Sequence, residues 1–185
     1  MKKLFLTFIA LFCTPLIVLA EQIHFDNETY NLKFSALAPR TNGYGNEYYK
    51  NNENVSNWTK MVGVYYYPEE NDPIKFAQNF DKTIENTDNS MLLKLVENKK
   101  TDKAVMSFLI NNCENSKNYF EYDLYKFEKH HKKGMIVSKY AAKYFFKDNS
   151  EITKIAQNIK KNNDKYLELF IVSPTPAIIE KEILK

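Results

Sequence analysis

Cysteine is scarce in this chain of 185 residues, which contains only Cys13 and Cys113. Cys13 falls in an N-terminal segment with the layout of a signal, so the chain that follows keeps one cysteine and can form no internal disulfide. The sequence also has no paired CxxC or HExxH motif, and therefore none of the common zinc-binding patterns. A hydrophobic core must stabilise the fold, and this length is enough for one ordinary domain.

Glycine is nearly as scarce, with four in the chain. The glycine-dependent motifs of serine hydrolases and nucleotide-binding proteins, GxSxG, GxGxxG and the Walker lysine loop, are absent from the sequence. These absences favour a protein that is not an enzyme, with no cofactor. A small hydrolase stays open as an alternative, using either Cys113, with His130 or His131 as its base, or carboxylates that no motif singles out. Otherwise we expect Cys113 to be a partly buried, inert thiol.

The net charge of the chain is also small. The formal net charge of +3 includes Lys2 and Lys3 of the N-terminal segment, which leaves +1 for the chain from Glu21 onwards. So weak an excess gives no chain-wide electrostatic basis for binding nucleic acid. Asn and Lys are abundant and Arg40 is the only arginine, a composition typical of an AT-rich bacterial genome.

Residues 1–20, MKKLFLTFIALFCTPLIVLA, combine a positive start, a short apolar centre and a small final residue. This layout predicts a secretory signal peptide that is cut after Ala20. Threonines and a proline interrupt the apolar run, which is too short and broken for a membrane span of about 20 apolar residues. No later segment is apolar enough either, so we predict a periplasmic or secreted protein without a transmembrane segment. Its product should begin at Glu21 outside the cytoplasm, and an intact Met1 in the cytosolic fraction would contradict this.

Apolar alternation and turn residues predict a series of strands. The first two form a hairpin over residues 22–34, with a turn at Asp26-Asn27. The others are expected near residues 46–50, 60–67, 91–96, 104–110, 119–128 and 135–146. The last two are joined through KHHKKG and form a second, longer hairpin.

Two segments have the capping residues and apolar spacing of amphipathic helices. One begins at Asp72-Pro73, since Asp is a good N-cap and Pro is favoured in the first helical turn. The other begins after Asp148, with Glu151 placed for a capping box. Whether this helix continues through Asn162–Asp164 is left open by the sequence.

The elements together predict an α+β fold: one domain over residues 21–172, with a mainly antiparallel sheet and both helices on one face. Residues 173–185 are predicted to be a C-terminal tail with room for a short helix.

A distinctive stretch precedes the strand at 60–67. Glu53 is followed after four residues by Trp58-Thr59-Lys60-Met61, and an Asp-Pro pair comes after the strand. This pattern resembles a group of small exported bacterial proteins in which Glu-x4-Trp-Thr/Ser-x-Met leads into a strand and a helix. The similarity extends over about residues 46–170. The resemblance implies the fold and a location outside the cytoplasm, and it provides no active-site residues.

The same stretch is rich in aromatic side chains. We interpret Trp58 as a structural anchor that buries its ring at the sheet edge, with a ligand platform as the alternative. In the strand that follows, Tyr66 should face the core with Val62 and Val64. Tyr65 and Tyr67 should face the opposite side of the sheet, because successive side chains of a strand alternate between its two faces.

Three lysines form the candidate partner site. Lys139, Lys143 and Lys147 recur every four residues on the odd-numbered face of the predicted strand, where they could meet an acidic protein or an anionic component of the envelope. The alternative is a solvated face in which Glu121 and Asp123 of the neighbouring strand neutralise part of the charge.

The histidines give no metal site in this reading, because adjacent side chains such as His130 and His131 should point apart. The sequence thus predicts an exported, non-enzymatic protein that binds a partner or assists an envelope process. Two alternatives remain: a small secreted hydrolase, and a secreted effector or immunity-type protein that acts on a protein of another cell.

Overall fold

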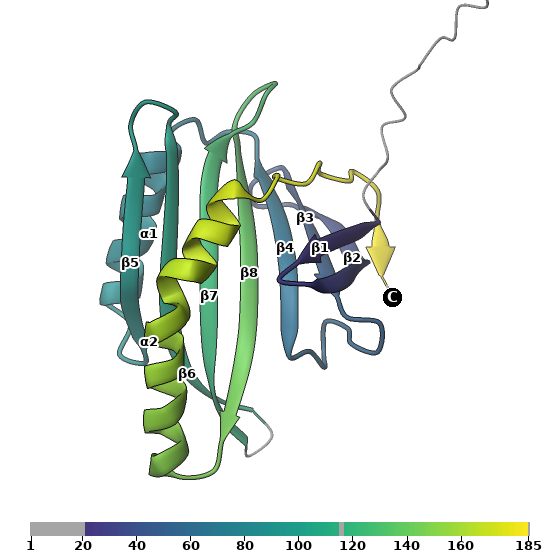
Figure 1. Ribbon diagram of the computed structural model, residues 1–185. Helices are drawn as coiled ribbons and strands as arrows, with labels where there is room; N and C mark the ends of the chain where they lie inside the picture. The colour runs from purple at the N-terminus through teal and green to yellow at the C-terminus, as the bar shows by residue number, and fades with distance from the viewer. Residues whose placement is uncertain (1–20, 115–116, 185) are drawn as a thin grey trace, which may run out of the picture.

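The computed structural model of this chain describes residues 21–114 and 117–184 (Figure 1). The predicted signal peptide, residues 1–20, lies outside them. The described residues form one antiparallel sheet in the order β1-β2-β3-β4-β8-β7-β6-β5, with β9 paired to β2. Its strands are β1 (Gln22–Phe25), β2 (Glu28–Ala38), β3 (Gly43–Tyr49), β4 (Lys60–Tyr67), β5 (Ser90–Asn98), β6 (Lys103–Glu114), β7 (Lys117–Lys129), β8 (Met135–Phe146) and β9 (Ile183–Leu184). The predicted α+β class is confirmed.

The sheet consists of two four-stranded meanders. Strands β1 to β4 pair in chain order, and β5 to β8 do the same. The two halves meet where β4 pairs antiparallel with β8 along its whole length, from Lys60 opposite Ala142 to Tyr67 opposite Met135. The predicted hairpin turn at Asp26-Asn27 is also confirmed, with both residues at positive φ (48° and 59°), as a two-residue turn of this type requires.

Both helices begin where the sequence predicts. In α1 (Pro73–Glu85), the Asp72 carboxylate accepts a hydrogen bond from the Lys75 amide. In α2 (Asn149–Val172), the Asp148 carboxylate accepts from the amides of Ser150 and Glu151.

Helix α2 runs without a break through the three polar residues that the sequence left open. The side chain of Asn163 is buried there and accepts a hydrogen bond of 2.9 Å from the Tyr122 hydroxyl of β7. This bond satisfies a polar group that would otherwise be costly to bury inside a packed helix.

The helices cover opposite faces of the sheet, and the prediction of one shared face is wrong (Figure 1). Helix α1 packs with Met106 and Phe108 of β6, whereas α2 packs in the cluster that contains Val105 and Leu109. Neighbouring residues of a strand point to opposite faces, so these two sets lie on different sides. Strands β6 to β8 are apolar on both faces and each face needs a cover. A helix's apolar stripe does not reveal which face it will cover.

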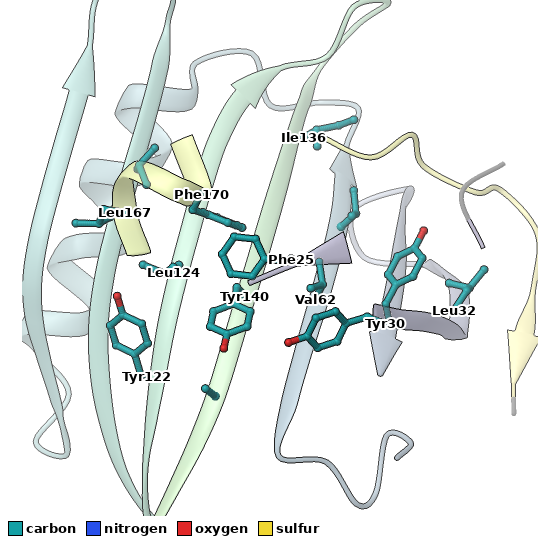
Figure 2. Close-up of a cluster of buried hydrophobic side chains, with 14 of the residues drawn as sticks. Phe25, Tyr30, Leu32, Val62, Tyr122, Leu124, Ile136, Tyr140, Leu167 and Phe170 are labelled. Atoms are coloured by element: carbon teal, nitrogen blue, oxygen red, sulfur yellow. The ribbon is translucent and has the colours of Figure 1, made fainter. Parts of the chain in front are cut away.

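The larger core lies between the sheet and α2 (Figure 2). This first core cluster takes side chains from both meanders, from α2 and from the C-terminal tail. Its buried members include Phe25, Tyr30, Val62, Tyr122, Leu124, Tyr140, Leu167, Phe170 and Ile179. Burial of this apolar surface is the main stabilising contribution to the fold.

The C-terminal tail is part of this core, and no helix forms in its described residues. Ile179 is buried, and its amide and carbonyl both bond to the buried side chain of Asn46, at 2.6 and 2.9 Å. The same carbonyl accepts from the hydroxyl of Ser35. Beyond it, β9 pairs with β2. The predicted short helix is therefore replaced by extended chain whose polar groups are satisfied by β2 and β3.

This arrangement makes Asn46 a testable anchor of the tail. Replacing Asn46 by Ala would leave the buried amide of Ile179 without a partner and its carbonyl with the Ser35 hydroxyl alone, which costs about 1–3 kcal/mol of unfolding free energy. Urea denaturation of residues 21–185 would measure the loss. Asn52→Ala, at an exposed position, serves as the control. Equal stability of the two variants would show that the Asn46 bonds contribute nothing.

Candidate functional site

The structure does not place the three lysines of the predicted partner site on one exposed surface. Lys139 lies in the middle of β8 with its side chain only 14% exposed. The Nζ atom of Lys143 lies 4.2 Å from the centre of the Trp58 ring and 4.9 Å from that of Tyr119. Lys147 follows the end of β8 and is exposed. Lys139 and Lys143 share one face of β8, whereas Lys147 lies beyond the strand, and the surroundings of the three differ.

Lys139 is the centre of a buried ionic cluster. Its Nζ atom lies 3.1 Å from a carboxylate oxygen of Glu121 and 3.1 Å from one of Asp123. Burial raises the pKa of Asp123 to about 7; the charge of Glu121 adds to this rise and that of Lys139 opposes it. Burial alone would lower the pKa of Lys139, but Asp123, Tyr125 and Glu121 raise it well above its usual value. The ammonium of Lys139 thus lies between two carboxylates, and the buried one, Asp123, keeps its proton to a higher pH than an exposed aspartate does.

The tyrosines of β4 divide between the two faces as predicted. Tyr65 and Tyr67 pack against the second core cluster, on the α1 side, while Tyr66 packs against the first. The ring of Tyr65 lies close over Gly63, where a Cβ atom would come within 2.6 Å of it. Its hydroxyl donates a hydrogen bond of 3.1 Å to Glu47. The close ring packing indicates a structural role for Tyr65.

Trp58 precedes β4, an interior strand of the sheet, and is only half-buried, where a ring buried at the sheet edge was expected. Its ring packs against a small third cluster formed by Tyr49, Met61 and Ala141, apart from the two larger ones. The ammonium of Lys143 covers the ring. This geometry is a cation–π contact that shields the ring from solvent.

The hydrolase alternative loses its dyad. Cys113 is exposed, where a partly buried thiol was expected. It pairs with Asn118 near the start of β7, whereas His130 follows the last residue of that strand. Strand residues rise about 3.3 Å each, so about 40 Å of strand separates the thiol from the imidazole.

The sequence predicted that the side chains of the two adjacent histidines point apart. In the structure they lie against each other. Their ring centres are 4.2 Å apart in an edge-to-face contact. His130 is further fixed by the ring of Tyr66, 4.8 Å away, and by the Lys133 carbonyl. The described residues contain no group of three or more His, Cys, Asp or Glu side chains that could hold a metal ion.

A pocket of about 260 Å³ opens on the α2 side of the sheet, between β1, β4 and the end of α2. Its walls are mainly apolar. Two of the lining residues, Phe25 and Phe170, are in edge-to-face contact with ring centres 5.5 Å apart (Figure 2). The pocket is lined by Gln22, Ile23, His24, Phe25, Val62, Lys126, Ser138, Phe170, Ser173, Pro174 and Pro176.

Two polar side chains, Lys126 and Ser138, form the floor of this pocket. They lie opposite each other in the β7–β8 pairing and point to the same face. The Lys126 side chain is 5% exposed and donates to the Ser173 carbonyl at 2.7 Å, with Glu128 at 3.5 Å. Burial lowers the pKa of Lys126, and the charge of Glu128 opposes this. Ser138 is 2% exposed, and its hydroxyl has no hydrogen-bond partner among the described residues.

Sequence reasoning missed both floor residues, although their positions carry a signal. Lys126 follows Phe120, Tyr122 and Leu124 at alternate positions, and Ser138 lies between Ile136 and Tyr140 in the same kind of row. A polar residue within an apolar alternate row indicates either a satisfied core group or a binding group. Only the fold shows which residues lie across from it.

Comparison with known proteins gives one match. A protein-family model matches residues 17–175 of the chain. No curated protein and no solved structure matches it. No helix of the described residues is both long and apolar enough to cross a membrane. The match spans the stretch on which the resemblance was based, while the Trp58-centred motif itself stays a prediction.

The buried ionic cluster predicts a pH-dependent stability. The folded state holds a proton on Asp123 that the unfolded state has lost, in the interval between the usual pKa of 3.8 and about 7. The free energy of unfolding therefore falls as pH rises through this interval. The variant Asp123→Asn lacks this titrating group. The free energy of unfolding of wild type minus that of the variant should therefore decrease from pH 5 to pH 8.

Urea denaturation at the two pH values would measure this change. The control is Asp164→Asn, an exposed partner of Lys94. For the control, the difference from wild type should stay nearly constant. A constant difference for Asp123→Asn as well would contradict the assignment.

Proposed function

We propose that this chain, which belongs to the family whose model it matches, is an exported protein that binds a small, mostly apolar molecule without transforming it. The periplasm or the extracellular medium is the proposed location, and the proposal rests for this part on the signal pattern of residues 1–20. Binding of such a molecule is how the protein would assist a process of the cell envelope.

One observation carries the binding proposal: Ser138, whose buried hydroxyl has no described partner, lines an apolar pocket together with Lys126, the residue opposite it in β7. Ligand sites are typically concave and mainly apolar, with a few polar groups that fix orientation. A buried hydroxyl without a partner loses its hydrogen bonds to water, which costs about 1–3 kcal/mol. A ligand that bonds to it would recover this free energy.

Two features of the structure favour binding over hydrolysis. The separation of Cys113 from His130 removes the cysteine–histidine dyad, one of the two routes by which a hydrolase could act. In addition, the pocket floor pairs its lysine with a backbone carbonyl and a carboxylate, so the lysine is held in a fixed position. A fixed ammonium suits recognition of a ligand.

The test is recovery of the ligand from the protein. Wild type would be secreted by a bacterial host, purified under native conditions and denatured, and the released compounds would be identified by mass spectrometry. Ser138→Leu should fill the floor and Ile23→Phe should narrow the pocket from β1. Both should reduce recovery about tenfold or more, since overfilled sites exclude ligands sterically.

The matched control is Val96→Phe, the same kind of enlargement on β5, at the opposite edge of the sheet. It should release as much compound as wild type. Equal recovery from all four folded proteins, or no compound from wild type, would contradict the proposal.

A further inference from the structure

The floor of the pocket carries an excess of positive charge. Lys126 and Lys103 both contact the carboxylate of Glu128, at 3.5 and 3.4 Å, so two cations share one anion. The Glu128 oxygen nearest Lys126, Oε2, also accepts a hydrogen bond of 2.7 Å from the Thr175 hydroxyl. The described residues that line the pocket include no acid, and His24 is the other ionisable group there. A single negative charge would balance this site.

The floor also offers two hydrogen-bond donors to the same place. An ammonium has three N–H groups, and those of Lys126 are used by Ser173 and Glu128, which leaves one. The hydroxyl of Ser138 is the second donor. Lys126 and Ser138 lie opposite each other in the antiparallel β7–β8 pair and both line the pocket, so the two donors come from the same side of it. A carboxylate has two acceptor oxygens and one charge, whereas a phosphate monoester would bring more charge than the floor balances.

The walls and the volume limit the rest of the ligand. Above the floor, the lining side chains are mostly apolar, with Ile23, Phe25 and Val62 on the sheet and Phe170 on α2. A cavity of about 150 Å³ in another protein binds benzene, so a pocket of 260 Å³ scales to about ten non-hydrogen atoms. This is the size of an eight-carbon fatty acid or a small aromatic acid.

We infer that the pocket binds a small monocarboxylate, with its carboxylate on Lys126 and Ser138 and its apolar body against the side chains above them. The inference rests on the proposed function, because it assigns a ligand class to the same pocket. Charge selects the anion, the two donors fix its position, and the apolar walls accept the chain.

Octanoate, octan-1-ol and octylamine are the probes for isothermal titration of residues 21–185 at pH 7. They share one apolar chain and differ in the charge of the end group. Octanoate should bind about tenfold more tightly than octan-1-ol, since a hydrogen bond to a charged group contributes more than one to a neutral group. Octylamine, which is cationic at this pH, should show no binding. Butyrate should bind more weakly than octanoate because it buries less apolar surface.

Two variants locate the site. Lys126→Met should weaken octanoate about tenfold or more while octan-1-ol binding stays within about twofold. Ser138→Ala also weakens octanoate and leaves the Lys126 contacts in place, so it decides the question if Lys126→Met does not fold. Ser107→Ala is the matched control: Ser107 is likewise buried without a described partner for its hydroxyl, but it does not line this pocket. Its octanoate affinity should equal that of wild type.

The outcomes separate the two proposals. Equal binding of octanoate and octan-1-ol, or octanoate binding unchanged by Ser138→Ala, would overturn the carboxylate inference and leave the apolar binding function in place. Failure of both octanoate and octan-1-ol to bind the wild type would overturn both.

Discussion

The pairing of β4 with β8 joins the two halves of this protein, and both of its polar centres lie on β8 beside β4. Gly63 lies opposite Lys139, and Val64 lies opposite Ser138. Because Gly63 has no side chain, the ring of Tyr65 can lie over it beside the buried ammonium of Lys139. Val62 and Ser138 bring the N-terminal and C-terminal meanders together at one pocket. Without this long-range pairing, the pocket would lack Val62, and the ionic cluster of β7 and β8 would lose its neighbour Tyr65.

Neighbouring residues of β8 place their side chains on opposite faces of the sheet. Ser138 lines the pocket on the α2 side, while Lys139 joins Glu121 and Asp123 on the other side. A slip of one residue in a strand's pairing would exchange its two faces. The register therefore has to be fixed firmly, and the aromatic and apolar packing on both faces provides this constraint. Two polar centres can coexist in so thin a layer because the sheet separates them.

Local sequence patterns predicted much of this fold. The turn at Asp26-Asn27, the helix caps Asp72 and Asp148 and the hairpin of β7 and β8 depend on residues close in the chain, which a reader of the sequence can recognise. The faces covered by the helices depend on packing between distant segments. The same is true of the tail, whose Ile179 is fixed by Asn46 of β3.

The candidate site shows the same limit. The sequence puts Lys139 on the odd-numbered face of its strand, but it could not show that Lys139 is buried between two carboxylates. Read along the chain, Lys126 and Ser138 are only polar residues within apolar alternate rows. They become a pocket floor only because β1, β4 and the end of α2 enclose them, and that enclosure is a property of the tertiary structure.

The central claim is that the β7–β8 register builds a carboxylate-binding floor beneath an apolar pocket. A crystal structure of residues 21–185 grown with octanoate tests it most directly. The account predicts octanoate in the pocket, with its carboxylate within hydrogen-bonding distance, about 3 Å, of both Lys126 Nζ and Ser138 Oγ. An octanoate bound outside the pocket, or one with its carboxylate at the rim beside His24 and its chain on the floor, would contradict it.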